Sequence, residues 1–112
     1  MSCLFCRIIA GELAATIVYR DDDVLAFRDA HPQAPTHILV IPTRHIASIA
    51  DTQDNDADLL GRLIIVAKQV AQTEKLSAGY RLVVNTGTQA GQSVFHLHVH
   101  LLGGRAMHWP PG

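Results

Sequence analysis

Apolar residues and histidines alternate strictly over residues 95–101, and this pattern constrains the fold more than any other feature of the sequence. Successive side chains of a β-strand point to opposite faces of its sheet. A strand over residues 95–102 would carry an apolar face that packs against helices, formed by Phe95, Leu97, Val99 and Leu101. Its other face, turned toward a cleft or solvent, would carry the imidazoles of His96, His98 and His100. One histidine on such a face is ordinary, but three in register favour a functional site.

The three imidazoles are poorly placed to bind one metal ion together. Residues four apart on a strand lie about 13 Å apart and point the same way, whereas zinc holds its nitrogen ligands at about 2.0–2.1 Å. A pair of them could still share an ion. A row of imidazoles suits phosphorus chemistry better, because a histidine with an ordinary pKa of about 6.5 can serve as a neutral nucleophile or as a charged donor.

The loop before this strand has the composition of a phosphate site. Gly87 and Gly91 let the backbone approach a ligand closely. Asn85, Gln92 and Ser93 add side chains that can donate hydrogen bonds. Any hairpin needs a polar loop containing glycine, so the loop by itself is a weak signal. It indicates a phosphate site only because the three histidines follow it.

The chain of 112 residues fits one domain, residues 1–112, and its 48% hydrophobic content excludes a disordered protein. Its formal net charge of −1 offers no basic footprint for duplex nucleic acid. The apolar stretches are too short to span a bilayer, and the first residues do not follow the pattern of a signal peptide. Two neighbouring cysteines without a secretion signal fit a reducing compartment, so we expect a cytoplasmic protein.

Apolar patterning and turn residues predict five strands and two helices. The expected strands cover residues 16–20, 24–28, 37–41, 80–85 and 95–102, and a short helix covers residues 3–10. The second helix follows acidic residues suited to a helix N-terminus, Asp51, Asp54, Asp56 and Asp58. Its predicted apolar stripe consists of Leu59, Leu60, Leu63, Ile64, Ala67, Val70 and Ala71. Because strands and helices do not alternate, we expect an α+β fold, an antiparallel sheet with its helices on one face.

Residues 92–102 contain the pattern His-φ-His-φ-His-φ-φ, in which φ is apolar, and resemble the signature of the histidine triad (HIT) superfamily. Further matching segments extend the resemblance over essentially the whole chain, at residues 4–5, 25–29, 32–37 and 103–105. Ser93 before the triad and the terminal sequence His108-Trp109-Pro110-Pro111-Gly112 are most similar to the histidine triad nucleotide-binding (Hint) branch. The resemblance implies a HIT-like fold assembled as a homodimer.

The resemblance to Hint proteins implies a purine-nucleotide phosphoramidase that hydrolyses nucleoside 5′-monophosphoramidates, with aminoacyl-adenylates as a further substrate class, and that needs no cofactor for catalysis. His98 would be the nucleophile that takes up the nucleotidyl group. His100 would hydrogen-bond the α-phosphate, and Ser93 would assist near the leaving amine. His37 would orient the nucleophile from behind and fix its tautomer, while His96 would support the same face.

The same resemblance implies a nucleotide pocket. Asp29 would accept hydrogen bonds from ribose hydroxyls. Phe5 and Phe27 would wall the base pocket, although phenylalanines in such positions more often belong simply to the hydrophobic core. The other expected nucleotide-binding residues are Arg28, Ala30, Asn85, Gly91, Gln92, Ser93, His98, His100 and Trp109.

Two departures from the Hint pattern leave the base preference open. Arg28 stands where Hint proteins often carry histidine, and His31 stands where a small polar residue is common. Both would lie near the ribose and the base, so AMP-type and GMP-type substrates both remain open. Trp109 is the only tryptophan and belongs to a tail that, in Hint-like dimers, approaches the partner's site.

Cys3 and Cys6 have the spacing of metal ligands, but a zinc site needs two more. Some bacterial HIT proteins bind zinc through such an N-terminal pair and two histidines that match His45 and His96, and this resemblance implies a structural zinc site. Two buried thiols at the start of an amphipathic helix explain the cysteine pair equally well.

Two other functions are compatible with these residues. A dinucleoside polyphosphate hydrolase, as in the fragile-histidine-triad branch, would use the same histidines, but Ser93 and the C-terminal tail favour a phosphoramidase. A nucleotide- or zinc-binding module with little catalysis is the other alternative. The presence of all three histidines together with Asn85 and Ser93 argues against it.

Overall fold

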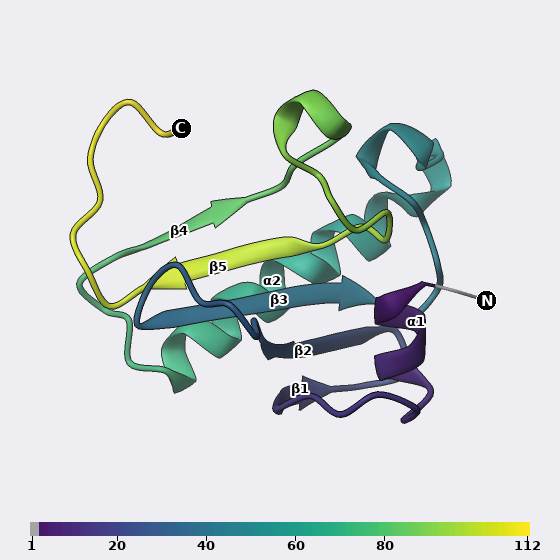
Figure 1. Ribbon diagram of the computed structural model, residues 1–112, viewed down its shortest axis with the longest axis horizontal. Helices are drawn as coiled ribbons and strands as arrows, with labels where there is room; N and C mark the ends of the chain where they lie inside the picture. Colours follow the sequence, from purple (N-terminus) through teal and green to yellow (C-terminus); the bar gives the residue numbers. More distant parts are fainter. Residues whose placement is uncertain (1–2) are drawn as a thin grey trace.

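In the computed structural model, which describes residues 3–112, five antiparallel strands form one sheet in the order β1-β2-β3-β5-β4 (Figure 1). The strands are β1 (Ile17–Arg20), β2 (Val24–Arg28), β3 (Thr36–Pro42), β4 (Tyr80–Val83) and β5 (Val99–Gly103). The α-helices of these residues are α1 (Leu4–Ile9) and α2 (Ala57–Thr73), and short 3-10 helices are η1 (Ile49–Asp51), η2 (Asp54–Asp56) and η3 (Thr88–Ala90). The predicted α+β fold, an antiparallel five-stranded sheet with two helices, is confirmed.

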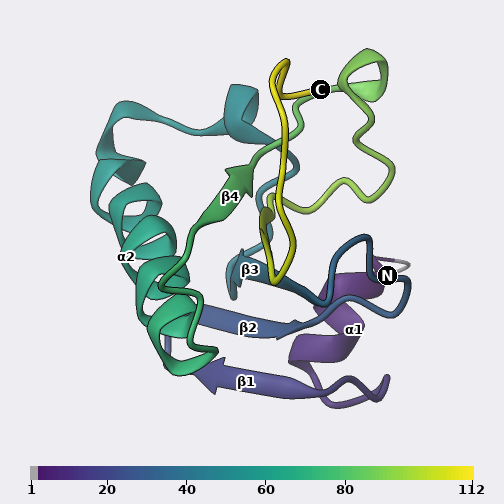
Figure 2. The ribbon, with the colours of Figure 1, turned by 90° about the vertical axis from the view of Figure 1, so that its left-hand side faces the viewer.

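The two helices cover opposite faces of the sheet (Figure 2). Along β2, Val24 and Ala26 pack on the α2 side, whereas Leu25 and Phe27 pack on the α1 side. β3 alternates in the same way. The expectation that both helices share one face is therefore wrong. Both faces of β2 and β3 are apolar, and each face needs a helix to remove it from water.

One side of α2 is buried against the sheet. The residues on that side are Leu63, Val66, Ala67, Val70 and Ala71. The predicted stripe is wrong at Ile64, which is 45% exposed, and it omits Val66, which is fully buried. Val66 follows Leu63 by three residues, so the two share a helix face, whereas Ile64 is rotated from Leu63 by about 100°. The acidic segment before the helix forms a capping box in which the amide of Gln53 donates to the Asp56 carboxylate, but this box caps η2. Asp56, the N-cap residue of α2, makes no side-chain cap hydrogen bond to α2, so the predicted acidic cap of the long helix is shifted one element upstream.

β5 begins at Val99, four residues after the predicted start at Phe95. The preceding segment leaves the sheet: the amide of Leu97 donates to the carbonyl oxygen of Ile46 over 2.7 Å. Phe95 is accordingly 45% exposed instead of part of the core. The predicted alternation does hold within β5: Val99 and Leu101 are buried on the α2 side, while His100 faces the α1 side.

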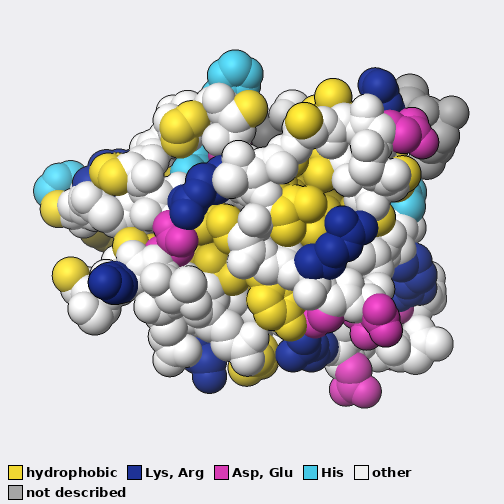
Figure 3. All heavy atoms as spheres, turned by 90° about the horizontal axis from the view of Figure 1, so that it is seen from below, with side chains coloured by type: hydrophobic (Ala, Val, Ile, Leu, Met, Phe, Trp, Pro, Cys, Tyr) yellow, Lys and Arg dark blue, Asp and Glu magenta, His cyan; other side chains and the backbone are white. Residues whose placement is uncertain are grey.

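The surface carries charges of both signs. Seen from the side on which β1 lies in Figure 1, lysine and arginine side chains are interspersed with acidic ones around exposed apolar side chains (Figure 3). Two ion pairs connect the sheet with the region of α2, Arg28 with Glu74 and Arg62 with Asp21. Among residues 3–112, no helix is long and apolar enough to cross a bilayer.

Candidate active site and cysteine–histidine cluster

A cavity of about 660 Å³ opens on the face of the sheet that α1 covers. α1 and the segment after it form one wall, the end of β2 and its following loop form another, and the start of β5 closes the cavity. Eight predicted nucleotide-binding residues line it: Phe5, Phe27, Arg28, Asp29, Ala30, Ser93, His98 and His100. This convergence makes the cavity the candidate active site.

A second hollow, of about 700 Å³, lies beyond the other end of β5. Lys75, Arg81 and Arg105 line it. The two guanidinium groups donate to backbone carbonyl oxygens, mainly of the C-terminal segment, and so hold that segment in place. No histidine is among its described lining residues, so this hollow lacks the imidazoles that could act as nucleophile or donor in the first cavity.

His98 is buried just before β5, and its ring borders the cavity. Nδ1 of this ring lies 2.7 Å from the carbonyl oxygen of His96. A carbonyl oxygen only accepts, so the neutral ring carries its proton on Nδ1 and keeps a lone pair on Nε2. The structure corrects the expected role of His37 here, because a backbone carbonyl, and not His37, fixes the tautomer of His98.

His37 instead forms a hydrogen-bonded pair with His100, in which Nε2 of His37 lies 2.9 Å from Nδ1 of His100. Nδ1 of His37 accepts the backbone amide of Gln33 over 3.0 Å, so the proton of the neutral His37 ring is on Nε2 and is donated to His100. His100 therefore carries its own proton on Nε2. The rings of His98 and His100 lie side by side, with centroids 4.9 Å apart. One ring thus offers a lone pair and its neighbour an N–H donor.

Burial keeps the His37–His100 pair neutral. Burial lowers the pKa of His37, and the nearby Asp29 carboxylate opposes this shift. Burial, followed by the charges of His98 and His37, lowers the pKa of His100 to about 4. Near neutral pH, neutral tautomers therefore set the direction of the hydrogen bonds that run from Gln33 to His100.

Asp29 follows β2 directly and lies at the cavity. One of its carboxylate oxygens accepts the amide of His31 over 2.8 Å, and the other lies 3.5 Å from Nε2 of His37. A carboxylate has about four acceptor positions, so further lone pairs remain for a ligand. Asp29 can therefore accept hydroxyl donors such as those of a ribose.

Phe5 and Phe27 pack edge to face, with ring centroids 5.4 Å apart. Both are almost fully buried and both line the cavity, so they belong to the core and to the cavity wall at once. The ring of Phe5 also meets the ring of His98 at 86°, with centroids 5.2 Å apart. α1 therefore carries an apolar wall that rests directly on His98.

Several predicted pocket residues direct their side chains elsewhere. Although Arg28 stands in the cavity lining, its guanidinium is on the α2 side of β2 and makes two 2.9 Å hydrogen bonds to Glu74. The amide of Gln92 donates to the carbonyl oxygens of Ala47 and Val94 and accepts from the amide of Gly87, so it holds the loop together. The described lining of the cavity also excludes Asn85, Gly91, Gln92 and Trp109. Arg28 points away from the cavity because alternate residues of β2 face opposite sides of the sheet, and Gln92 does so because its buried amide is hydrogen-bonded to backbone atoms.

The cavity also contains residues that the sequence analysis does not assign to a pocket. Most are apolar or small: Leu4, Ile8, Leu13, Ala14, Ala15, Thr16, Leu39 and Val94. No sequence signal separates an apolar cavity wall from a core residue, since both are buried by the same force. His31 also lines the cavity, in agreement with the expectation that it lies near the ribose and the base.

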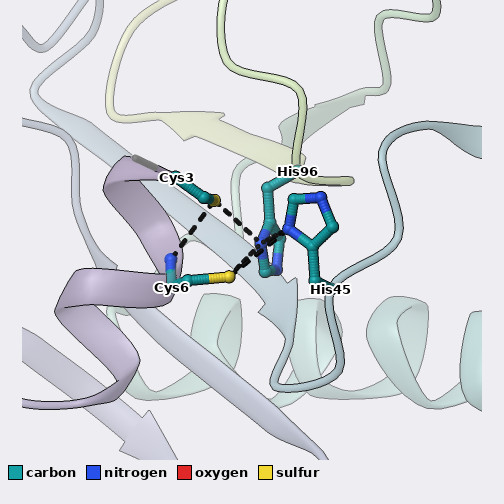
Figure 4. A group of neighbouring side chains, drawn as sticks. All are labelled: Cys3, Cys6, His45 and His96. Atoms are coloured by element: carbon teal, nitrogen blue, oxygen red, sulfur yellow. Dashed lines mark hydrogen bonds between the residues drawn. The ribbon is translucent and has the colours of Figure 1, made fainter. Parts of the chain in front are cut away.

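Cys3, Cys6, His45 and His96 converge on one point beside the cavity (Figure 4). Nδ1 of His96 lies 3.4 Å from Sγ of Cys3, 3.6 Å from Sγ of Cys6 and 3.2 Å from Nδ1 of His45. Sγ of Cys6 lies 3.3 Å from Nδ1 of His45. Zinc bonds of about 2.3 Å to sulfur and 2.0–2.1 Å to nitrogen, at tetrahedral angles, separate ligand atoms by about 3.3–3.8 Å. The donor atoms thus stand near the spacing that zinc requires.

The hydrogen bonding of His96 leaves the correct nitrogen free for a metal. Its Nε2 donates to the carbonyl oxygen of Pro42 over 2.8 Å, so Nδ1 keeps a lone pair and faces the two sulfur atoms. Burial, and then the neighbouring Cys3 thiol, raise the pKa of the Cys6 thiol to about 11, so a metal must displace its proton. The chemistry of this donor set fits a four-coordinate zinc ion.

A second group of candidate donors, Asp29, His37 and His100, fails the same test. A metal on Nε2 of His37 would require the proton of that ring on Nδ1, where the amide of Gln33 already donates. Two donors would then face each other. This group fits the neutral hydrogen-bonded pair described above and not a metal site.

Comparison with known proteins shows the family. The model of the HIT domain matches residues 10–107, and the chain belongs to the HIT domain family. An uncharacterized HIT-like protein of Synechococcus elongatus is 53% identical, over 97% of this chain and 96% of its own. A 14 kDa zinc-binding protein of Zea mays is 52% identical, over 97% of this chain and 87% of its own. The crystal structure of a HIT family hydrolase from Legionella pneumophila Philadelphia 1 has a TM-score of 0.97 and 56% identity, covering 99% of this chain and 100% of that chain. The resemblance to the HIT superfamily is confirmed.

Proposed function

We propose that this protein is a hydrolase of the Hint type that cleaves the P–N bond of purine nucleoside 5′-monophosphoramidates, with His98 as its nucleophile. The observation that carries the proposal is the 2.7 Å hydrogen bond from Nδ1 of His98 to the carbonyl oxygen of His96, which leaves a lone pair on Nε2 at the cavity. The hydrolase name of the Legionella relative supports the reaction class.

In the first step, the lone pair on Nε2 of His98 attacks the α-phosphorus. The P–N bond of the substrate breaks, and its electron pair leaves with the amine, which takes up a proton that the Ser93 hydroxyl relays from water. Nε2 now holds the nucleotidyl group and the ring is cationic. The hydrogen bond from Nδ1 to the His96 carbonyl oxygen stabilises this cation, because the acceptor is a fixed dipole.

In the second step, water attacks the same phosphorus atom. The bond from Nε2 to phosphorus breaks, its electron pair returns to His98, and the proton lost by water goes to solvent. The nucleoside monophosphate is released and the ring regains its starting tautomer. The sum of both steps is one water consumed for one P–N bond, so no oxidant, reductant or cofactor is needed.

The neighbouring side chains bind and orient the nucleotide in this proposal. His100 donates its Nε2 proton to a non-bridging oxygen of the α-phosphate, with its tautomer set by His37. Asp29 accepts the ribose hydroxyls, and Phe5 and Phe27 form an apolar wall for the base. Phe5 and Phe27 carry no polar group, so these two rings by themselves do not distinguish one purine from another.

We also propose that Cys3, Cys6, His45 and His96 hold a structural zinc ion. All four positions of a tetrahedral ion are then protein ligands, so the metal takes no part in the reaction. Its contribution is to tie α1 to the sheet. The name of the Zea mays relative, a zinc-binding protein, agrees with this assignment. A homodimer in which Trp109 of each chain approaches the partner's cavity completes the proposal.

The proposed nucleophile is tested by replacing His98 with Asn in an assay of adenosine 5′-monophosphoramidate. We expect His98→Asn to abolish turnover, because the amide has no nucleophilic lone pair, while its N–H can still donate to the His96 carbonyl oxygen. Binding of AMP, measured by calorimetry, should persist and would show that the cavity is intact. Undiminished turnover in this variant would refute the proposal.

The wild-type protein separates the related functions in the same assay. Faster hydrolysis of diadenosine polyphosphates than of the phosphoramidate would indicate a dinucleoside polyphosphate hydrolase. Binding of AMP without turnover of either substrate would indicate a binding module.

A further inference from the structure

His96 connects the cysteine–histidine cluster with the proposed nucleophile. Its ring faces the cluster through Nδ1, and its backbone carbonyl oxygen accepts the Nδ1 proton of His98 over 2.7 Å. Its Nε2 donates to the carbonyl oxygen of Pro42. His96 is 0% exposed, so both ring nitrogens and the carbonyl oxygen are engaged within the protein. A shift of this ring would therefore move the backbone group that orients His98.

The segment around His96 lies outside the strands of the sheet, although its side chains are buried. It precedes β5, and its pairing with β3 starts only at Val99. Its backbone is linked instead by the amide of Leu97, which donates to the carbonyl oxygen of Ile46. Ile46 directly follows the cluster residue His45. The position of the segment before β5 therefore depends on the segment after β3. Side chains of the two segments meet in the cluster, through His45 and His96, and in the core on the α2 side, which contains Ile46 and Leu97.

α1 reaches His98 by a second route. Cys3 and Cys6 flank Phe5, whose ring packs edge-on against His96 (centroids 5.9 Å apart, 65°) and against His98 (5.2 Å, 86°). A cation that binds both sulfur atoms fixes the start of α1, and with it this ring. Without a cation, the four donors are held to one another only by weak thiol and imidazole contacts.

We propose that the cysteine–histidine cluster is a positioning device for His98: zinc bound there fixes His96, and the His96 carbonyl oxygen and the Phe5 ring then hold His98 with Nε2 aimed into the cavity. The inference rests on the proposed function in that His98 is the nucleophile. The metal ligands touch no substrate in this arrangement. His96 and His45 are positioning residues, and their effect on the reaction passes through the orientation of one ring.

The orientation can be read without any activity measurement. Two-bond ¹H–¹⁵N spectra of the imidazoles, taken at one neutral pH, distinguish the Nδ1–H from the Nε2–H tautomer of His98. Zinc-loaded wild-type protein should show His98 as a single Nδ1–H tautomer whose proton exchanges slowly. His45→Ala removes the most exposed ligand and should give a mixture of tautomers with faster exchange. His45→Cys keeps four zinc ligands and should restore the single tautomer.

The rates should follow the spectra. Because a misplaced reacting group costs up to about 100-fold in rate, we expect His45→Ala to lower kcat for adenosine 5′-monophosphoramidate by about 10- to 100-fold. The dissociation constant for AMP should change less, since Asp29 and Phe27 are attached to β2 and not to the cluster. Arg7→Ala, on the same helix but outside the cluster and the cavity lining, is the matched control and should leave tautomer and kcat unchanged.

Elemental analysis of each variant accompanies both measurements. A His45→Ala protein that has lost its zinc but keeps the single tautomer and the full kcat would overturn the positioning role. If His45→Ala retains zinc through three ligands, Cys3→Ser/Cys6→Ser is measured in its place with the same criteria. Failure of the zinc-loaded wild type to hydrolyse the phosphoramidate would instead contradict the proposed function. The tautomer measurement would still show whether zinc at the cluster fixes the orientation of His98.

Discussion

His98 and His100 stand two residues apart, and their hydrogen-bond partners give the two rings opposite roles. His98 faces a carbonyl oxygen, which places its proton on Nδ1. His100 faces the N–H of His37, which places its proton on Nε2. The side that each ring presents to the cavity therefore depends on partners from the segment before β5 and from β3, and not on the histidine itself.

At this scale we expect His37→Leu, which has no hydrogen-bonding group, to impair His100 through its tautomer. Without the His37 donor, His100 can place its proton on Nδ1 and turn a lone pair toward the phosphate. Removing a donor to a developing oxyanion costs about 100- to 1000-fold in kcat, so His100→Leu should fall in that range and His37→Leu at or below it. The double variant His37→Leu/His100→Leu should be no slower than His100→Leu, since both changes remove one interaction. Additive losses in kcat would contradict this relay.

At the scale of elements, the turn between β1 and β2 is joined to α2 by one carboxylate. Oδ1 of Asp21 accepts the amides of Asp23 and Val24, both at 2.8 Å, and its Oδ2 accepts the Tyr19 hydroxyl and the Arg62 guanidinium. The hydrogen bond from Tyr19 is the main cause that lowers the pKa of Asp21 to about 2, and the two turn amides and Arg62 add to it. A single side chain thus closes the hairpin and fixes it to the helix.

Asp21→Asn should lower the free energy of unfolding at neutral pH by about 1 kcal/mol, after allowance for solvent screening of this partly exposed group. The folded pKa of about 2 lies below the usual 3.8, so the contribution is complete above about pH 4 and is lost as the pH falls toward 2. Urea unfolding of both proteins at several pH values measures the difference. Asp22→Asn, on the same turn, should change stability by less than about 0.5 kcal/mol. An Asp21→Asn difference that persists at pH 2 would be incompatible with this origin.

At the scale of the whole molecule, the sheet separates two cores of different construction. The α2 side is closed by a long helix with a continuous apolar face. The α1 side is closed by a helix of 6 residues, too short to be stable by itself, and it contains the cavity. The cysteine–histidine cluster is at the start of this short helix, so a metal there would stabilise the side of the molecule that has the smaller core.

Zinc should therefore raise the thermal stability of the metal-free protein. A ligand at about 100 times its dissociation constant contributes about 2.7 kcal/mol, which corresponds to roughly 10 °C or more in Tm for a chain of this size. Differential scanning calorimetry with and without zinc measures the shift. Cys3→Ser/Cys6→Ser should show no shift on adding zinc. An equal shift in both proteins would place the stabilising metal elsewhere.

The sequence by itself determined what depends on local pattern. The alternation over residues 95–101, the apolar stripe with its acidic cap and the turn residues predicted an antiparallel α+β sheet, and four strands lie within two residues of the expected bounds. The motif of residues 92–102 identified the family. These features are local, because side-chain periodicity and turn chemistry are properties of neighbouring residues.

Only the tertiary structure decided which groups meet across the fold. Because β5 begins only at Val99, His96 lies outside the strand and its ring faces the cysteines and not the other two histidines. Arg28 follows the alternation of β2 and therefore lies on the α2 side. The tautomers of His98 and His100 follow from a backbone carbonyl and from the amide of Gln33. Such contacts join residues that are distant in sequence or are made by backbone atoms common to every residue, so no pattern of residue types can show them.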